Sequence, residues 1–198
     1  MIAGVVLAAG GGRRFGARKQ LADLHGRPLL EHALVAMAAA PLDRVFVVLG
    51  AGAEEVSGRV NMHGAEPVPC DRWDAGLSAS LRAGIDAAAG AEAVAIVLGD
   101  QPLISPEAVA RVVAARGGAA AVRATYGGVP GHPVLLEDRL FARARKLRGD
   151  TGARALLTGV RVREVACDEL GGPDDVDTPE QLARLVSLRD PRRLRWRG

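Results

Sequence analysis

Short, nearly continuous hydrophobic runs alternate with longer segments of helical periodicity along most of this chain. The runs Gly4–Ala9, Arg44–Gly50 and Ala93–Asp100 are too short for helices, and each ends at or directly before glycine or aspartate, as is typical of buried parallel strands. Helical patterns over Pro28–Ala40 and Leu77–Ala89 separate them. This alternation predicts an α/β fold with a doubly wound sheet.

The second half of the chain departs from this alternation. Ser105–Arg116 predicts a helix, with Ser105 as N-cap and Pro106 at the first helical position. Residues 119–137 predict two antiparallel strands that turn at Tyr126–Gly128, so the sheet is expected to be mixed. Further elements are predicted as a basic helix (Asp138–Leu147), a loop (Arg148–Gly152), a helix from Ala153, a strand (Val160–Cys167) and a helix from Thr178.

Composition limits the class of protein. The chain has 198 residues and 48% hydrophobic content, which favours one globular domain, here residues 1–188. Apolar runs are far shorter than the ~20 residues of a membrane span, and no signal peptide is recognisable, so we expect a cytoplasmic protein without membrane contact. Cys70 and Cys167 are isolated and are expected to be buried thiols. The net charge is only +3; residues 189–198 form a basic tail, expected to be mobile, and nucleic acid is not an expected partner.

The loop after the first strand carries three consecutive glycines followed by four cationic residues. Gly11 and Gly16 have the spacing of a Walker A loop, but Ala17 and Arg18 stand where Lys and Ser or Thr are required. A dinucleotide fingerprint counted from Gly10 would need glycine where Phe15 stands. Both of these phosphate-binding motifs are therefore excluded.

Glycine and positive charge in this loop still indicate an anion. Backbone N–H groups of Gly10–Gly12 can approach phosphate oxygens, with Arg14 and Lys19 adding positive charge. Since ligands of open α/β sheets bind at the carboxyl ends of the strands, a polyphosphate is the expected ligand. The alternative is a glycine-rich turn with solvated arginines.

Asp100 ends the strand Ala93–Asp100 and is expected at the same edge of the sheet. A carboxylate would repel a polyphosphate unless a divalent cation lay between them. Mg²⁺ takes one or two carboxylates together with phosphates and waters, so Asp100 predicts a magnesium site. The alternative is an aspartate that caps the following turn.

Six segments, in order, resemble the MobA-like nucleotidyltransferases, whose signature loop has the general form L-A-x-G-x-x-x-R-M-G-x-x-K. Phe15 replaces the usual Met, and Gly12 stands where Ser or Thr is frequent. The similarity covers nearly the whole chain except the tail. Its segments are LAAGGGRRFGARK (7–19), WDAGLSASLRAGI (73–85), GDQPL (99–103), VPGHPVLL (129–136), GDTGARALL (149–157) and DVDTPEQL (175–182).

Within that family the resemblance is closest to the molybdenum cofactor cytidylyltransferases of the MocA type. It implies a Rossmann-like three-layer α/β/α sandwich with a mostly parallel, mixed sheet. The implied reaction is Mg²⁺-dependent transfer of CMP from CTP, or of a nucleotide from another NTP, to molybdopterin with release of pyrophosphate. The implied recipient of the product is a xanthine dehydrogenase-class apo-enzyme.

The resemblance also implies roles for individual residues. Ser78 and Ser80, near the start of a helix, could bind a base or phosphate or simply cap the helix. Thr178 and Gln181 form a capping box that explains their segment without a ligand, yet Asp175 or Asp177 just before it could reach the metal. The implied residues are Arg14, Lys19 and Asp100 for catalysis; Leu7, Ala8, Ala9, Gly10, Gly11, Gly12, Arg14, Lys19, Gly76, Ser78 and Ser80 for the nucleotide; His132 and Asp150 for the acceptor; and Asp100, with Asp175 or Asp177, for the metal.

Two other functions are compatible with this fold. One is an oxidoreductase of the nicotine blue oxidoreductase type that uses a reduced nicotinamide cofactor. The other is a non-catalytic carrier of the molybdenum cofactor. The missing dinucleotide fingerprint and the presence of Arg14, Lys19 and Asp100 favour a metal-bound triphosphate over both.

Overall fold

The computed structural model describes residues 1–12 and 14–187. A seven-stranded sheet in the order β5-β4-β1-β6-β8-β7-β9 forms its centre, and β2 and β3 form a separate two-stranded ribbon. The strands are β1 (Ile2–Ala8), β2 (Asp23–Leu24), β3 (Arg27–Pro28), β4 (Arg44–Leu49), β5 (Glu66–Pro69), β6 (Ala93–Leu98), β7 (Ala121–Tyr126), β8 (Val129–Glu137) and β9 (Val162–Ala166).

The sheet is mostly parallel, as predicted. β1 pairs in parallel with both β4 and β6, and β5 continues the parallel part beyond β4. β8 runs antiparallel to its neighbours β6 and β7, whereas β9 is parallel to β7. The three hydrophobic runs are therefore buried parallel strands, and the glycine-containing turn after Tyr126 joins an antiparallel pair.

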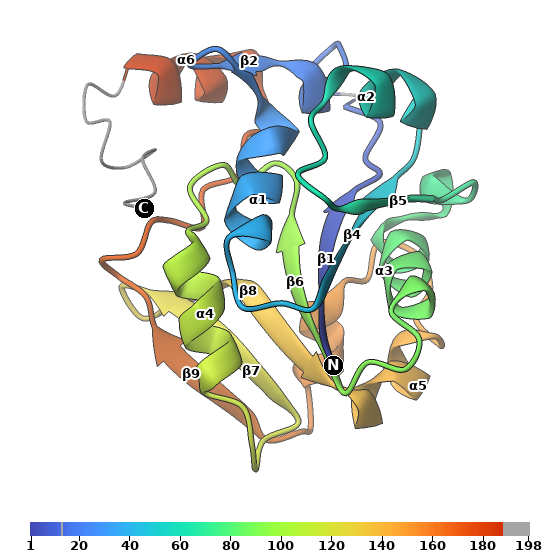
Figure 1. Ribbon diagram of the computed structural model, residues 1–198, viewed down its shortest axis with the longest axis vertical. Coiled ribbons are helices and arrows are strands. Elements are labelled where there is room, and N and C mark those ends of the chain that lie inside the picture. The colour runs from blue at the N-terminus through green and yellow to red at the C-terminus, as the bar shows by residue number, and fades with distance from the viewer. Residues whose placement is uncertain (13, 188–198) are drawn as a thin grey trace.

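Helices cover both faces of the sheet, which gives the predicted three layers (Figure 1). Alternate residues of β1 point to opposite faces: Val5 belongs to the apolar cluster on one face of the sheet and Val6 to the cluster on the other. Fully burying a large apolar side chain contributes about 1.5–3 kcal/mol, so the two apolar layers fix the sheet from both sides. The helices are α1 (Leu29–Ala38), α2 (Ala53–Arg59), α3 (Leu77–Ala87), α4 (Pro106–Ala114), α5 (Phe141–Ala144) and α6 (Pro179–Ser187), with 3₁₀ turns at Lys19–Leu21, Trp73–Ala75, Asp138–Leu140 and Ala153–Leu157.

Helix ends agree with the sequence at two positions. The Ser105 hydroxyl accepts a hydrogen bond from the backbone N–H of Ala108 at 3.0 Å, which caps α4 as predicted. At α6 the Thr178 hydroxyl accepts from Gln181, and the Gln181 side chain accepts from the Thr178 N–H. The predicted capping box is therefore present.

Other elements differ from the prediction. The basic helix predicted over Asp138–Leu147 is a 3₁₀ turn followed by one turn of α-helix, α5, and the helix predicted from Ala153 is a 3₁₀ turn. In α5, Phe141 and Ala144 are buried against α3 while the residues between them are exposed. One turn therefore suffices to bury the apolar positions of that segment.

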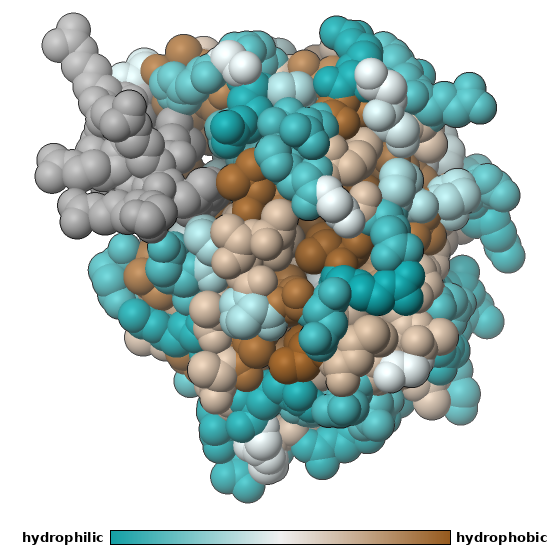
Figure 2. Space-filling view, viewed as in Figure 1, coloured by the Kyte–Doolittle hydropathy of each residue, from teal (hydrophilic) through white to brown (hydrophobic). Residues whose placement is uncertain are grey.

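On the face of the molecule seen in Figure 2, apolar side chains are interspersed with hydrophilic ones. No helix within residues 1–12 and 14–187 has the length and hydropathy required to cross a membrane. Arg13 and the basic tail, residues 189–198, lie outside the described residues.

Candidate active site

A cavity of about 560 Å³ opens at the carboxyl ends of β1 and β6, the edge at the top of Figure 1. Its volume is within the range of small-molecule sites. It is lined by predicted site residues from the first loop, the start of α3, the end of β6 and two later segments. These predicted residues are Leu7, Ala8, Ala9, Gly10, Gly11, Gly12, Arg14, Lys19, Gly76, Ser80, Asp100, Asp150 and Asp177.

The glycine loop leaves backbone donors available. Gly12 has a positive φ of 62°, and its carbonyl accepts hydrogen bonds from the N–H groups of Phe15 and Gly16 at 3.0 and 3.1 Å. Within residues 1–12 and 14–187, the N–H groups of Gly10 and Gly11 have no acceptor. Orphan N–H groups beside cationic side chains suit an anionic ligand.

Lys19 lies between two carboxylates. Its Nζ donates hydrogen bonds to Asp100 Oδ2 at 2.7 Å and to Asp177 Oδ1 at 2.9 Å. The Arg14 Nη1 donates to the other oxygen of Asp177 at 3.2 Å. Only 15% of the Lys19 side chain is exposed to solvent, so these charges interact more strongly than they would at the surface.

The pKa values of these groups reflect burial and mutual charge. Burial opposes the charged form of Lys19, but Asp100 and Asp177 outweigh it and raise the Lys19 pKa. The hydrogen bond from Lys19 lowers the pKa of Asp177. Burial raises the pKa of Asp175, and the nearby Asp100 carboxylate raises it further. Lys19 and Arg14 thus neutralise Asp100 and Asp177, whereas the nearby Asp175 pairs with neither cation.

The cluster fits a divalent cation that is shared with a ligand. Asp100 Oδ1 is buried and has no hydrogen-bond partner among the described residues, so one lone-pair-bearing oxygen is available. Across residues 1–12 and 14–187, no group of three or more His, Cys, Asp or Glu side chains is arranged to hold a metal alone. Asp100 and Asp177 could therefore supply two ligands, with phosphates and waters completing the coordination preferred by Mg²⁺.

Asp175 does not line the cavity. Its Oδ1 accepts a hydrogen bond from Gln101 Nε2 at 2.7 Å. Of the two aspartates that the sequence could not separate, Asp177 is therefore the one at the cavity.

The start of α3 corrects a prediction. The N–H of Ser78 donates to the Gly149 carbonyl at 3.1 Å, and the N–H of Leu77 donates to Asp150 Oδ1 at 3.3 Å. These groups are not free for a phosphate. Ser78 and Ser80 lie inside the helix and do not cap it; Ser80 lines the cavity and Ser78 does not.

His132 is also not among the cavity residues. Burial lowers the pKa of this half-buried histidine to about 4 despite the attraction of Asp100. Its glycine neighbour is explained by packing, since a Cβ on Gly131 would lie 2.9 Å from Pro173 and 3.1 Å from the Tyr126 ring. Packing alone therefore explains why a glycine precedes His132.

Arg18 pairs with Glu55 and donates to the Ala51 carbonyl at 2.8 Å. It packs over Gly52, where a Cβ would lie 2.1 Å from the guanidinium carbon. This cation of the first loop therefore fixes the start of α2 and does not line the cavity.

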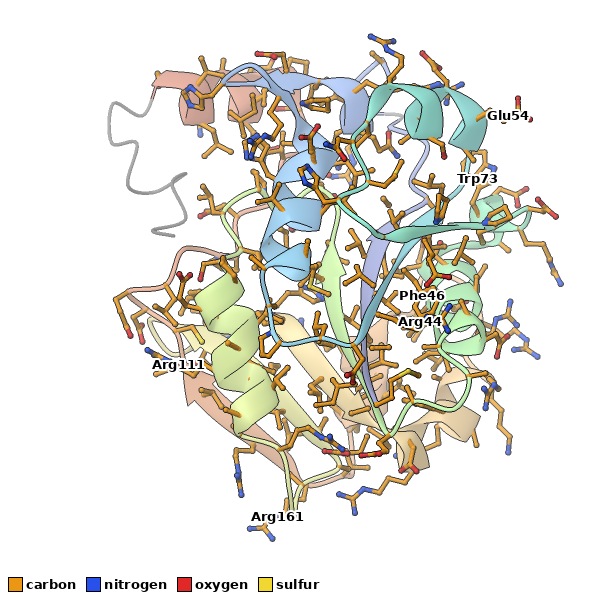
Figure 3. The ribbon with its side chains drawn as sticks, in the orientation of Figure 1. Arg44, Phe46, Glu54, Trp73, Arg111 and Arg161 are labelled. Carbon is orange, nitrogen blue, oxygen red and sulfur yellow. The ribbon has the colours of Figure 1, made fainter. Side chains whose placement is uncertain are left out.

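Several cavity residues were not assigned a role from the sequence. Trp73 and Asp74 precede α3 in a segment that was recognised only as a family resemblance, and Gln20 follows Lys19 directly. Figure 3 shows Trp73 near α2 and β5. A glutamine in a basic loop carries no signal of its own, because its role depends on backbone atoms that the sequence does not place. The unassigned lining residues are Phe15, Gln20, Trp73, Asp74, Leu77, Leu98 and Gly99.

The sheet topology and its solved neighbours define a Rossmann-like nucleotidyltransferase fold. Residues 4–165 match the model of the MobA-like NTP transferase domain. The chain therefore belongs to this nucleotidyltransferase-like family, which confirms the resemblance of the six segments.

Two relatives cover nearly the whole chain. Nicotine blue oxidoreductase of Paenarthrobacter nicotinovorans is 33% identical over 196 residues, which cover 93% of this chain and 96% of the relative. Purine catabolism protein PucB of Bacillus subtilis is 31% identical over 195 residues, covering 90% and 92%. Proteins that are similar to this chain over nearly its whole length therefore carry different functional names.

A solved structure adds a metal to the comparison. Rv0371C of Mycobacterium tuberculosis, in complex with manganese, superposes with a TM-score of 0.82 at 30% identity, covering 94% of this chain and 98% of that one. A related protein of this fold thus binds a divalent cation.

Proposed function

We propose that this protein is a Mg²⁺-dependent nucleotidyltransferase that transfers CMP from CTP to molybdopterin and releases pyrophosphate. The observation that carries the proposal is the meeting of three groups in one cavity: the glycine loop, the Lys19 ammonium, and the carboxylates of Asp100 and Asp177. A triphosphate with a divalent cation matches this combination of backbone donors, cation and carboxylates. We also propose that residues 1–188 act as one domain.

The chemistry needs positioning more than covalent participation by the protein. An oxygen of the acceptor phosphate attacks the α-phosphorus of the nucleotide, the new P–O bond forms, and the bond to pyrophosphate breaks. The N–H groups of Gly10 and Gly11 orient the phosphates, and Arg14 and Lys19 stabilise the charge that accumulates on them. Lys19 lies deepest in the cluster and is assigned to the reacting phosphate.

Lys19 has to change partners during binding. In the ligand-free protein its ammonium neutralises Asp100 and Asp177. When the triphosphate enters, the ammonium turns to the phosphates and leaves the carboxylates free to hold Mg²⁺, which supplies charge neutralisation when bound. Nucleotide and metal are therefore expected to bind cooperatively.

The acceptor and partner follow from the family resemblance. Asp150 lies at the cavity wall, where an acceptor could lie beside the triphosphate. A relative named for purine catabolism supports a xanthine dehydrogenase-class enzyme as recipient, because xanthine is a purine.

A second candidate is an NAD(P)H-dependent oxidoreductase, which the 33% identity to nicotine blue oxidoreductase favours. The paired carboxylates argue against it, because a dinucleotide pyrophosphate on a Rossmann-type loop is bound without an acidic metal cluster. We therefore rank it second.

Calorimetric titration of CTP, GTP and NADPH, each with and without Mg²⁺, separates the candidates. We expect CTP to bind preferentially in the presence of Mg²⁺ and to bind Asp100→Asn about 10- to 100-fold more weakly, a loss on the order of 1.4–2.8 kcal/mol. Asp175→Asn is the matched change at a carboxylate outside the cavity and should leave the affinity within about twofold. Binding of NADPH without binding of any triphosphate would overturn the proposal.

A further inference from the structure

Gln20 is a buried polar residue beside the glycine loop. Only 8% of it is exposed, although glutamine is mostly found at protein surfaces. Its side-chain Nε2 donates hydrogen bonds to the carbonyl oxygens of Ala8 and Gly10, both at 2.8 Å. Both hydrogens of the amide are therefore used to hold the backbone where β1 passes into the loop.

These bonds determine which way the neighbouring N–H groups point. A trans peptide unit is planar, so its C=O and N–H point in opposite directions. The carbonyl of Gly10 shares its peptide plane with the N–H of Gly11. Because Gln20 holds that carbonyl, the Gly11 N–H points away from Gln20, and it has no acceptor within residues 1–12 and 14–187.

Without such a bond the loop could present the wrong group to an anion. Glycine has no Cβ and adopts many backbone conformations, so a peptide plane in a run of glycines can rotate. Rotation of the Gly10–Gly11 peptide would turn a carbonyl oxygen toward the cavity, where it would repel a phosphate. Such a rotation would break the hydrogen bond from Gln20 to the Gly10 carbonyl.

Trp73 packs on the loop as well. A Cβ on Gly11 would lie 2.8 Å from Cζ3 of the Trp73 ring, and a Cβ on Gly50 would lie 2.7 Å from the Trp73 Cβ. The ring therefore lies against Gly11, the residue that follows the carbonyl held by Gln20. Its fluorescence can report the position of Gly11.

We propose that Gln20 is a positioning residue for phosphate binding: by fixing the Gly10 carbonyl it holds the Gly11 N–H available for a phosphate oxygen. This role rests on the proposed nucleotide function. It assigns to Gln20 part of the affinity for the triphosphate and none of the affinity for the acceptor.

The first test uses the ligand-free protein, with Trp196→Phe in all forms so that Trp73 is the sole tryptophan. Gln20→Met keeps the length of the side chain but removes both donors. We expect amide hydrogen exchange at Phe15 and Gly16, whose N–H groups are bonded to the Gly12 carbonyl, to accelerate about 10-fold, since the loop then opens more often, and Trp73 to become more accessible to acrylamide quenching. Ser105→Ala is the matched control, because it also removes a buried polar group with a backbone bond, but at the start of α4.

The second test measures CTP affinity in the presence of Mg²⁺ and the kinetic constants for both substrates. Gln20→Met should weaken CTP binding about 10- to 100-fold through misplacement of the loop and raise the KM for CTP, with the KM for molybdopterin unchanged. Ser105→Ala should change neither, although it should lower the urea midpoint of unfolding. Faster exchange with unchanged CTP affinity, or the same exchange in both variants, would overturn the role of Gln20.

The two proposals fail separately. If the parent protein binds no triphosphate, the proposed function is wrong and the phosphate-binding role of Gln20 is wrong with it. The exchange rates alone still decide whether Gln20 fixes the loop.

Discussion

Two glycine-containing segments meet at the cavity, and only one of them presents free backbone donors. At Gly10 and Gly11 the N–H groups have no acceptor within residues 1–12 and 14–187. At the start of α3, which follows Gly76, the Gly149 carbonyl and the Asp150 carboxylate already accept the first N–H groups. A helix N-terminus after glycine is thus an anion site only when no other segment caps it.

Lys19→Met gives the largest expected effect on the glycine-loop side of this comparison. Turnover with CTP should fall about 10²- to 10³-fold, because the charge on the reacting phosphate loses its cation. Binding of Mn²⁺ in the absence of nucleotide, followed by electron paramagnetic resonance, should become tighter, because Lys19 no longer competes for Asp100 and Asp177.

The matched control is Arg18→Met, which removes a cation of the same loop that pairs with Glu55 outside the cavity. Its turnover should stay within about threefold of the parent. Equal losses in the two variants would mean that the net charge of the loop, not the position of Lys19, governs the reaction.

Gly76→Ala tests the α3 side through stability. Gly76 has a φ of 98°, and a Cβ there would lie 2.5 Å from the backbone carbon of Gly149. We expect a loss of about 2–3 kcal/mol in the free energy of unfolding in urea, from strain and from separation of the capping loop. Gly90→Ala is the control, with a φ of 84° and no atom near the added Cβ, and should cost about 1 kcal/mol. Equal losses would show that the contact with Gly149 contributes nothing.

Asp150→Ala has the smallest expected effect and tests whether the cap of α3 keeps an anion away from the start of this helix. The N–H of Leu77 loses its acceptor, so the free energy of unfolding should fall by about 1 kcal/mol, as for other helix caps. CTP affinity should not weaken by more than about threefold, because this carboxylate accepts a hydrogen bond from the start of α3. A CTP affinity that increases strongly in calorimetry would instead show that the uncapped helix start binds the anion.

The elements and site residues that the sequence predicts are those specified by neighbouring residues. Continuous apolar runs identify β1, β4 and β6, and the caps at Ser105 and Thr178 follow from residues three positions away. The glycine loop and Asp100 were placed at one sheet edge because both follow predicted parallel strands. Local pattern was sufficient for these features.

The features that escaped prediction depend on distant residues or weak local signals. β5 is a short edge strand with prolines at 67 and 69, a composition that argues against a strand in the sheet interior. The capping of α3 could not be predicted because its acceptors lie about seventy residues later, at Gly149 and Asp150; the nucleotide-binding role of Ser78 stays a prediction. Asp175 and Asp177 could not be distinguished because they differ only in which partner, Gln101 or Lys19, each meets.

The bond between Lys19 and Asp177 joins positions 158 residues apart. Protein synthesis delivers Lys19 first, Asp100 next and Asp177 last of the three, and at ~5–20 residues per second several seconds separate Asp177 from Asp100. During that interval the ammonium has only one of its two carboxylate partners. The full charge arrangement of the cavity is therefore completed only after the strands that carry it have been synthesised.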